Sequence, residues 1–264
     1  MIIIPSTSRS IRLVYLLIAA GSNSVDTQEV WRLGLFLNPQ CAPGGNFDLY
    51  AWELYLPVGS AGSPTTIFTS ALEICSGYSN PGCFFTEAGD GAMVMKVPGS
   101  PSSSGCVTTP NTKYCRTELR EENPSSRDPK AATNRLSATV SVPKPDNSNH
   151  GTVIGQIHMA SSVSSYPVVK LYYNLNGDLT MGVHKSGLGG TEDYTSLGTI
   201  SVGQKFSYEI QYGKVSLSVS INGRATEDVS LGNLDSPWSY FKTENHNQGD
   251  SPSEVHFFEV AVQH

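Results

Sequence analysis

The sequence predicts an all-β protein made of antiparallel sheets, arranged as a sandwich or a jelly roll. Short runs that alternate apolar and polar residues recur from residue 48 to the end of the chain. Turn-forming residues separate these runs, and no long stretch shows an apolar period of 3.6 residues. Gly, Ser, Thr, Asn and Pro are abundant while only 15% of residues are charged, which is typical of a secreted, turn-rich β protein.

The first strand is expected at 48–57 and stops at Pro57, which has no amide hydrogen to donate. Eight further runs share its period of two, at 92–97, 135–142, 153–159, 168–175, 179–183, 205–212, 215–221 and 255–262. The pairs Asn176-Gly177 and Asn222-Gly223 are hairpin turn signals. We expect surface loops at 98–113 and 143–150, and one β domain over residues 46–264.

The N-terminus has the pattern of a secretory signal over residues 1–24. Arg9 and Arg12 flank the start of a short apolar run at 13–20, and small residues follow. This run is too short to span a bilayer, so no membrane partner is expected. Residues 25–45 would form an N-terminal extension, and the protein would be secreted. The alternative is a disordered N-terminal extension without a targeting role.

The charge balance argues against nucleic acid as a partner. The formal net charge is −6 and the pI is about 5.5, and no basic run is present. A negative total still permits a local basic surface, because the 17 Lys and Arg residues can be concentrated on one face.

Five cysteines lie in the first half of the chain, at positions 41, 75, 83, 106 and 115. Cys75 and Cys83 flank one turn-like segment, and Cys106 and Cys115 flank another, so we favour two local disulfides with this pairing. Sequence alone does not fix the connectivity, and one cysteine is left over. Zinc is the competing interpretation, but the spacings differ from zinc motifs and no His lies nearby.

Three separated segments place chemically capable side chains at alternate positions, and alternate residues of a strand share a face. The first segment, 116–120, would place Arg116, Glu118 and Arg120 together. The second segment, 156–158, would pair Gln156 with His158. The third segment, 240–248, would align the side chains of Tyr240, Lys242, Glu244, His246 and Gln248. If these faces line one groove, that groove suits a polymer that carries carboxylates.

The three segments resemble the signature blocks of alginate lyases of polysaccharide lyase family 7, in the same order. The family's Arg-Thr/Ser-Glu-Leu/Val-Arg block is matched fully at 116–120, and its Gln-Ile/Val-His block fully at 156–158. The Tyr-Phe-Lys-Ala-Gly-X-Tyr-X-Gln block is matched at Tyr240, Phe241, Lys242 and Gln248. The resemblance extends over the β region. It implies a β-jelly roll whose concave sheet forms the polysaccharide groove, and it implies cleavage of alginate.

The third block departs from the family pattern at three positions. His246 stands where the family has a catalytic Tyr, and Thr243-Glu244 replaces Ala-Gly. Imidazole can also give or accept a proton, with a pKa about 3.5 units below that of a phenol. We therefore expect His158 and His246 to form the proton-transfer pair. We also expect a pH optimum that lies further towards acid than in relatives with Tyr.

The resemblance assigns a role in β-elimination to each remaining site residue. Arg116 and Gln156 would neutralise the C6 carboxylate of the sugar, and His158 would remove the C5 proton. Glu118 would orient the neighbouring arginines. The expected contacts to flanking sugar units are Arg120, Tyr240, Lys242 and Gln248. Ile157 is the form of the second block associated with guluronate-containing substrates.

Three other functions stay open at this point. One is a non-catalytic jelly roll that binds anionic glycans, and another is a lyase for a different polyuronate such as glucuronan. The third is a glycoside hydrolase that uses Glu118 with Glu244 or Glu209, although no spacing supports that pair. No metal or cofactor motif is present, so we expect no metal and no cofactor. We also expect a monomer.

Overall fold

The structure is a computed structural model. It describes all residues except 1–36, 111, 131–133, 214–215, 225–226 and 232–233. The expected signal segment 1–24 therefore lies outside the described residues, as does 25–36 of the expected extension. Residues 37–45 are described. Leu37 packs against the core of the β domain, and a 3-10 helix forms at Pro43–Gly45.

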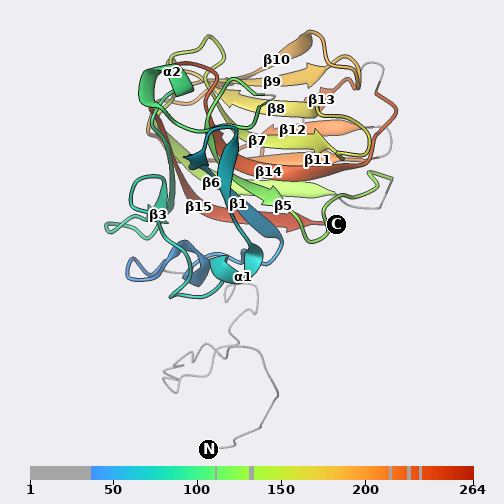
Figure 1. Cartoon of the computed structure of the whole chain (residues 1–264). Coiled ribbons are helices and arrows are strands. Elements are labelled where there is room, and N and C mark those ends of the chain that lie inside the picture. Colours follow the sequence, from blue (N-terminus) through green and yellow to red (C-terminus); the bar gives the residue numbers. More distant parts are fainter. Residues whose placement is uncertain (1–36, 111, 131–133, 214–215, 225–226, 232–233) are drawn as a thin grey trace, which may run out of the picture. The chain divides into compact units, whose positions relative to one another are not determined.

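The first sheet contains eight strands in the spatial order β10-β9-β8-β7-β14-β5-β1-β2 (Figure 1). Their bounds are β1 Trp52–Ser60, β2 Ser63–Ile67, β5 Arg116–Glu121, β7 Thr152–Met159, β8 Pro167–Tyr173, β9 Asp178–His184, β10 Glu192–Thr199 and β14 Ser239–His246. The strands β5, β7 and β14 carry the three motif segments and are direct neighbours, although they are distant in sequence.

The second sheet contains seven strands in the order β13-β12-β11-β6-β15-β4-β3. Their bounds are β3 Phe84–Thr86, β4 Met93–Val97, β6 Arg135–Lys144, β11 Phe206–Tyr212, β12 Leu217–Ile221, β13 Glu227–Val229 and β15 Ser253–Gln263. Two short helices, α1 Thr69–Leu72 and α2 Pro101–Ser104, lie in the connections. The strand pairs within both sheets are antiparallel, which confirms the predicted all-β class.

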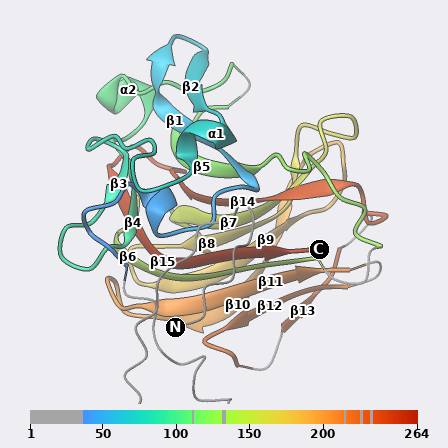
Figure 2. The ribbon, with the colours of Figure 1, turned by 90° about the horizontal axis from the view of Figure 1, so that it is seen from below.

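The core lies between the two sheets, which form separate layers in Figure 2. It is apolar and buried, and its members from the two layers include Leu54, Leu119, Ile157, Phe241, Met95, Val140, Tyr208 and Phe257. On β14, Thr243 contacts the Tyr208 hydroxyl at 3.3 Å, and Asn245 donates to the Met95 carbonyl at 2.8 Å. Odd-numbered residues of β14 therefore face the second sheet, so Lys242 and Glu244 lie on the outer face.

The cysteine pairing is partly as predicted. Cys106 and Cys115 form a disulfide, as expected. The predicted Cys75–Cys83 bond is wrong, because Cys75 is bonded to Cys41. Cys83 is free and buried in the core beside β3, where burial raises the pKa of its thiol to about 11. Two disulfides thus stabilise the described part of the domain, and one of them ties the 37–45 segment to it.

Candidate active site

The register of three neighbouring strands brings the motif residues together on the outer face of the first sheet. On β14 and β5, Lys242 is opposite Arg120, Glu244 is opposite Glu118, and His246 is opposite Arg116. On β14 and β7, Lys242 is also opposite Gln156, and Tyr240 is opposite His158. Directly opposed residues on antiparallel strands share a face. The alternation predicted from sequence therefore places these side chains as expected.

One row of residues crosses six strands of this face. From β5 to β10 it contains Arg120, Lys242, Gln156, Lys170, Gly182 and Tyr194. Neighbouring strands are about 4.8 Å apart, so the row places cationic and amide groups at regular steps across the sheet. We call it the cationic row. It was not predicted, because Lys170 has no motif and only the sheet order reveals its place beside Gln156.

Glu118 is the charged centre of the site and is almost fully buried. Its Oε2 lies 3.1 Å from Arg116 Nε and 3.0 Å from Lys242 Nζ. Burial alone would raise the pKa of this carboxyl, but the two cations outweigh it and hold the pKa well below its usual range. Glu118 therefore stays ionised and forms an ion pair with each of the two cations.

His158 is oriented as a free base. Its Nδ1 lies 2.8 Å from the Met159 carbonyl oxygen, which can only accept, so Nδ1 carries the proton and Nε2 keeps its lone pair. The ring stacks on Tyr240 with centroids 5.2 Å apart. Burial, followed by the charge of Lys242, lowers the pKa of His158 to about 3. The imidazole is therefore neutral at any pH near 7.

His246 is more enclosed than His158. Its Nδ1 lies 3.4 Å from Glu244 Oε2, and neither ring nitrogen has a hydrogen-bond partner among the described residues. Burial and the nearby Arg116 guanidinium lower the pKa of His246 well below its usual range. The His246 ring is therefore neutral at rest.

The remaining predicted binding residues lie at the margins of this cluster. Arg120 stacks over the Tyr240 ring at 4.6 Å and forms an ion pair with Glu122 at 2.9 Å. Gln248 lies beyond the end of β14. Its backbone amide donates to Asp146 Oδ2 at 2.6 Å, and its side chain donates to the Asn247 carbonyl at 2.7 Å. These contacts hold the Gln248 side chain against its own turn.

A second polar cluster lies on β8, β9 and β10 and was missed by the sequence reasoning. Glu192 accepts from Tyr172 at 2.7 Å and lies 2.6 Å from Lys170 Nζ and 2.9 Å from His184 Nε2. Burial raises the pKa of Glu192, but its partners outweigh this effect and lower it to about 2. Next to it, His150 stacks on the half-exposed Tyr194 with centroids 3.9 Å apart. The residues of this cluster come together because their strands are neighbours in the sheet, and they form no motif in the sequence.

A metal ion has one place to bind among the described residues, where Glu118, Glu244 and His246 bring ligand atoms within 4.8 Å of one another. However, Arg116 and Lys242 already lie on Glu118, and a divalent ion would add two more positive charges to a buried site. The donor set therefore suits a proton better than a metal. Glu209, the other carboxylate considered for hydrolysis, lies on β11 of the second sheet, so it cannot join Glu118.

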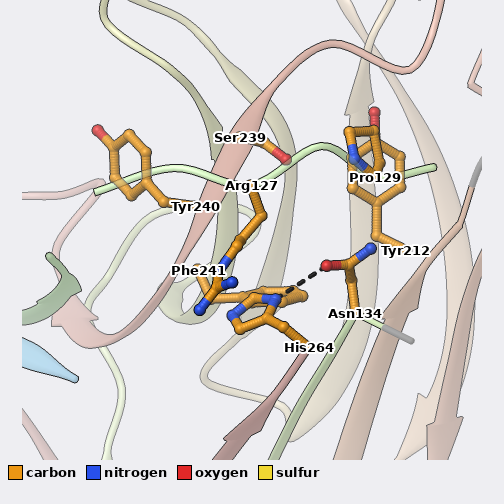
Figure 3. A pocket seen from close by; sticks show the side chains of 8 residues that line it. All are labelled: Arg127, Pro129, Asn134, Tyr212, Ser239, Tyr240, Phe241 and His264. Atoms are coloured by element: carbon orange, nitrogen blue, oxygen red, sulfur yellow. Dashed lines mark hydrogen bonds between the residues drawn. The ribbon is translucent and has the colours of Figure 1, made fainter. Parts of the chain in front are cut away.

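Figure 3 shows a small cavity at the start of β14, away from this cluster. His264 reaches Asn134 at 2.8 Å and also bonds to Glu121, whose carboxylate accepts from the Phe241 amide. Tyr240 is drawn at the left of the view, and its ring points away from His264 and Asn134. The cavity therefore belongs to the anchoring of β14 and not to the polar face.

Comparison with known proteins agrees with the geometry. The profile of the family described as Alginate lyase matches residues 47–264. An alginate lyase of Klebsiella pneumoniae is 27% identical over 241 residues, which cover 71% of this chain and 76% of that protein. A crystal structure of a variant of the family 7 alginate lyase A1-II′ with product (GGG) has a TM-score of 0.71 at 27% identity, and it covers 85% of this chain and 99% of that one.

The alginate lyase from Pseudomonas aeruginosa gives a TM-score of 0.68 at 28% identity, over 82% of this chain and 99% of the other. These similarities confirm the jelly-roll fold and the resemblance inferred from the three motif segments. The family profile spans the whole described β domain and includes all three segments. The chain therefore belongs to the alginate lyase family.

Proposed function

We propose that this protein cleaves alginate by β-elimination on the outer face of its eight-stranded sheet, leaving unsaturated uronate ends. The observation that supports this most strongly is that Arg116, Gln156 and His158 share one face. Lys242 lies on the same face, on β14 between β5 and β7. Membership of the alginate lyase family supports the same activity. Among the solved relatives, a variant of A1-II′ is in complex with substrate (GGMG).

The first requirement of the reaction is to mask the charge of the sugar carboxylate, so that the C5 proton becomes acidic. Arg116 and Lys242 together face one charged carboxylate, Glu118, which leaves one positive charge for the substrate. Gln156 adds a neutral amide, whose NH2 group can donate to the same carboxylate. Fixed donors of this kind stabilise the negative charge that develops in the enolate-like transition state.

The second requirement is a base that removes the C5 proton. We assign it to His158, because its Nε2 lone pair is held available by the Nδ1 hydrogen bond to Met159. The third requirement is an acid for the departing O4, which we assign to His246. As the C5–H bond breaks, its electrons form the C4=C5 double bond, the C4–O4 bond breaks, and O4 takes up a proton.

The cationic row gives the polymer a path across the sheet. Arg120, Lys242 and Lys170 would contact successive uronate units, and Tyr194 would provide an aromatic surface at the far end. We also propose a secreted monomer. Two disulfides support an oxidising compartment, and none of the helices in the described ranges could cross a membrane.

The test is product formation on separate mannuronan, guluronan and glucuronan, followed by the ultraviolet absorbance of unsaturated uronate. We expect absorbance to rise with the alginate blocks and not with glucuronan. Arg116→Ala should reduce kcat/KM by about 100-fold or more, because it removes the main carboxylate partner. Arg135→Ala is the matched control, since Arg135 lies on the second sheet. Equal loss in both variants, or no absorbance from any uronan, would contradict the proposal.

A further inference from the structure

Glu244 is a buried acid for which the mechanism above has no role. It lies opposite Glu118 on the neighbouring strand, and both side chains are almost fully shielded from solvent. Two ionised carboxylates in this position would repel each other strongly. Neither oxygen of Glu244 accepts a hydrogen bond from a donor in the described residues. A proton on Glu244 removes both difficulties, because the neutral acid no longer repels Glu118 and can donate from Oε2 to His246 Nδ1.

Glu244 is also next to the ring that has to supply a proton. Its Oε2 is 3.4 Å from His246 Nδ1, and the His246 side chain keeps 13% exposure while that of Glu244 has none. The ring therefore lies on the solvent side of the acid. These two residues are also the two positions at which the third motif block departs most from the family pattern, Glu for Gly and His for Tyr.

We propose that Glu244 is a positioning residue that stores a proton for the departing O4 and delivers it through the His246 ring. The proposal rests on the function proposed above. In the step, His246 Nε2 gives its proton to O4 while Nδ1 takes the proton of Glu244, which becomes a carboxylate. The C5 proton is meanwhile on His158. Exchange with water then deprotonates His158 and returns a proton to Glu244, so that no other reagent is consumed.

The charged groups around Glu244 are consistent with this role. Burial is the largest effect on its pKa and Glu118 is the next, and both raise it. Lys242 and Arg116 lower the pKa but do not outweigh them, while Tyr208 on β11 lies behind the strand and Lys170 on β8 acts on the His246 side. The surroundings therefore favour the protonated form of Glu244, and the His246 ring beside it is neutral.

The first experiment replaces the acid by its neutral isostere. Glu244→Gln has the shape of the protonated acid and is also uncharged, but it has no acidic proton. We expect kcat to fall by about 100-fold or more with KM unchanged, as for loss of a general acid. The wild-type enzyme should lose activity above the pKa of Glu244, and this alkaline decline should be absent in the variant. Glu259→Gln, an exposed residue of β15, is the matched control. Wild-type kcat and an unchanged pH profile in Glu244→Gln would overturn the proposal.

The second experiment tests the coupling between the two residues. Glu244→Gly and His246→Tyr each restore one residue of the family pattern, and the double variant restores both. We expect each single variant to be impaired and the double variant to recover activity, because each single change leaves half of a proton path. Losses that simply multiply in the double variant would show that the residues act independently.

The third experiment tests the protonation of Glu244 directly. It uses only the wild-type enzyme, so it does not depend on whether a variant folds. The infrared spectrum of the wild-type enzyme should show the carbonyl band of a buried carboxylic acid at neutral pH, and its absence would overturn the proposal. Loss of activity on treatment with a chelator, restored by Zn²⁺, would also overturn it, because a cation would then occupy the place of the proton. A wild-type enzyme that forms no product would refute the proposed function, while the infrared result would still report on Glu244.

Discussion

Protonation of His158 should become possible only in acid far below the usual range of histidine. Burial and Lys242 lower the pKa of His158 from 6.5 to about 3. At about 1.4 kcal/mol per pH unit, this difference corresponds to about 5 kcal/mol of disfavour for the charged ring. Because the base must be neutral to remove the C5 proton, we expect kcat/KM to show no acidic decline between about pH 5 and pH 8.

The assay is the initial rate of unsaturated uronate formation at low substrate concentration over this range, with the fold checked by circular dichroism at each pH. His158→Ala should reduce kcat by about 100-fold or more at every pH, since general-base catalysis is typically worth that much. A wild-type kcat/KM that falls about tenfold per unit below pH 6.5 would refute the assignment of an enclosed, neutral His158.

The lowered pKa values of His158 and Glu118 affect stability in the same direction, although one group is a base and the other an acid. His158 takes up its proton near pH 6.5 when unfolded but only near pH 3 when folded, so its contribution to stability falls as the pH falls between these values. Glu118 has a lowered pKa in the folded state, and its contribution is also lost as the pH falls below about 4.5. Between pH 7 and pH 4 the urea midpoint of the wild type should therefore fall more than that of His158→Ala, in which the other titrating groups are unchanged. The same pH dependence in both proteins would contradict the lowered pKa of His158.

Two further predictions concern the scaffold. Cys41→Ser opens the disulfide to Cys75, which joins residues 34 apart, and should lower the free energy of unfolding by about 3 kcal/mol in urea titrations; no loss of stability would contradict this prediction. Gly182→Ala would bring a Cβ to 2.5 Å from Glu192 Oε2, so it should lower the free energy of unfolding by about 1–3 kcal/mol. In the control Gly89→Ala the new Cβ meets nothing within 4 Å, so stability should not change. Equal urea midpoints for the two variants would contradict the crowding at Gly182.

Much of the fold could be predicted from alternation alone. Strands β4, β6 and β7 coincide with the expected runs within about two residues. In β6 the alternating pattern matches a strand with one buried face, whereas β4 and β7 are buried on both faces. Strand β10 was missed because it is a polar edge strand, and its residues give no alternating pattern. The Cys75 pairing was wrong because proximity in sequence favoured Cys83, whereas the fold brings Cys41 next to Cys75.

For the candidate site, the sequence predicted which residues of each strand lie on the same face of the sheet. Strand periodicity placed Arg116, Gln156 and His158 on one face once their strands became neighbours. The partner of each residue could not be predicted, because the order of strands within a sheet is set by long-range contacts. The position of Lys170 beside Gln156 was therefore not predicted, and neither was the direct pairing of Glu244 with Glu118.

The most direct test of the central claim compares wild-type enzyme, His158→Ala and His256→Ala on alginate, with ultraviolet absorbance and new reducing ends measured in the same samples. His256 lies on β15 of the second sheet and serves as the control. We predict that absorbance and reducing ends rise together in the wild type and in His256→Ala, and that both nearly vanish in His158→Ala. Reducing ends without the absorbance, or full activity in His158→Ala, would contradict elimination at this face.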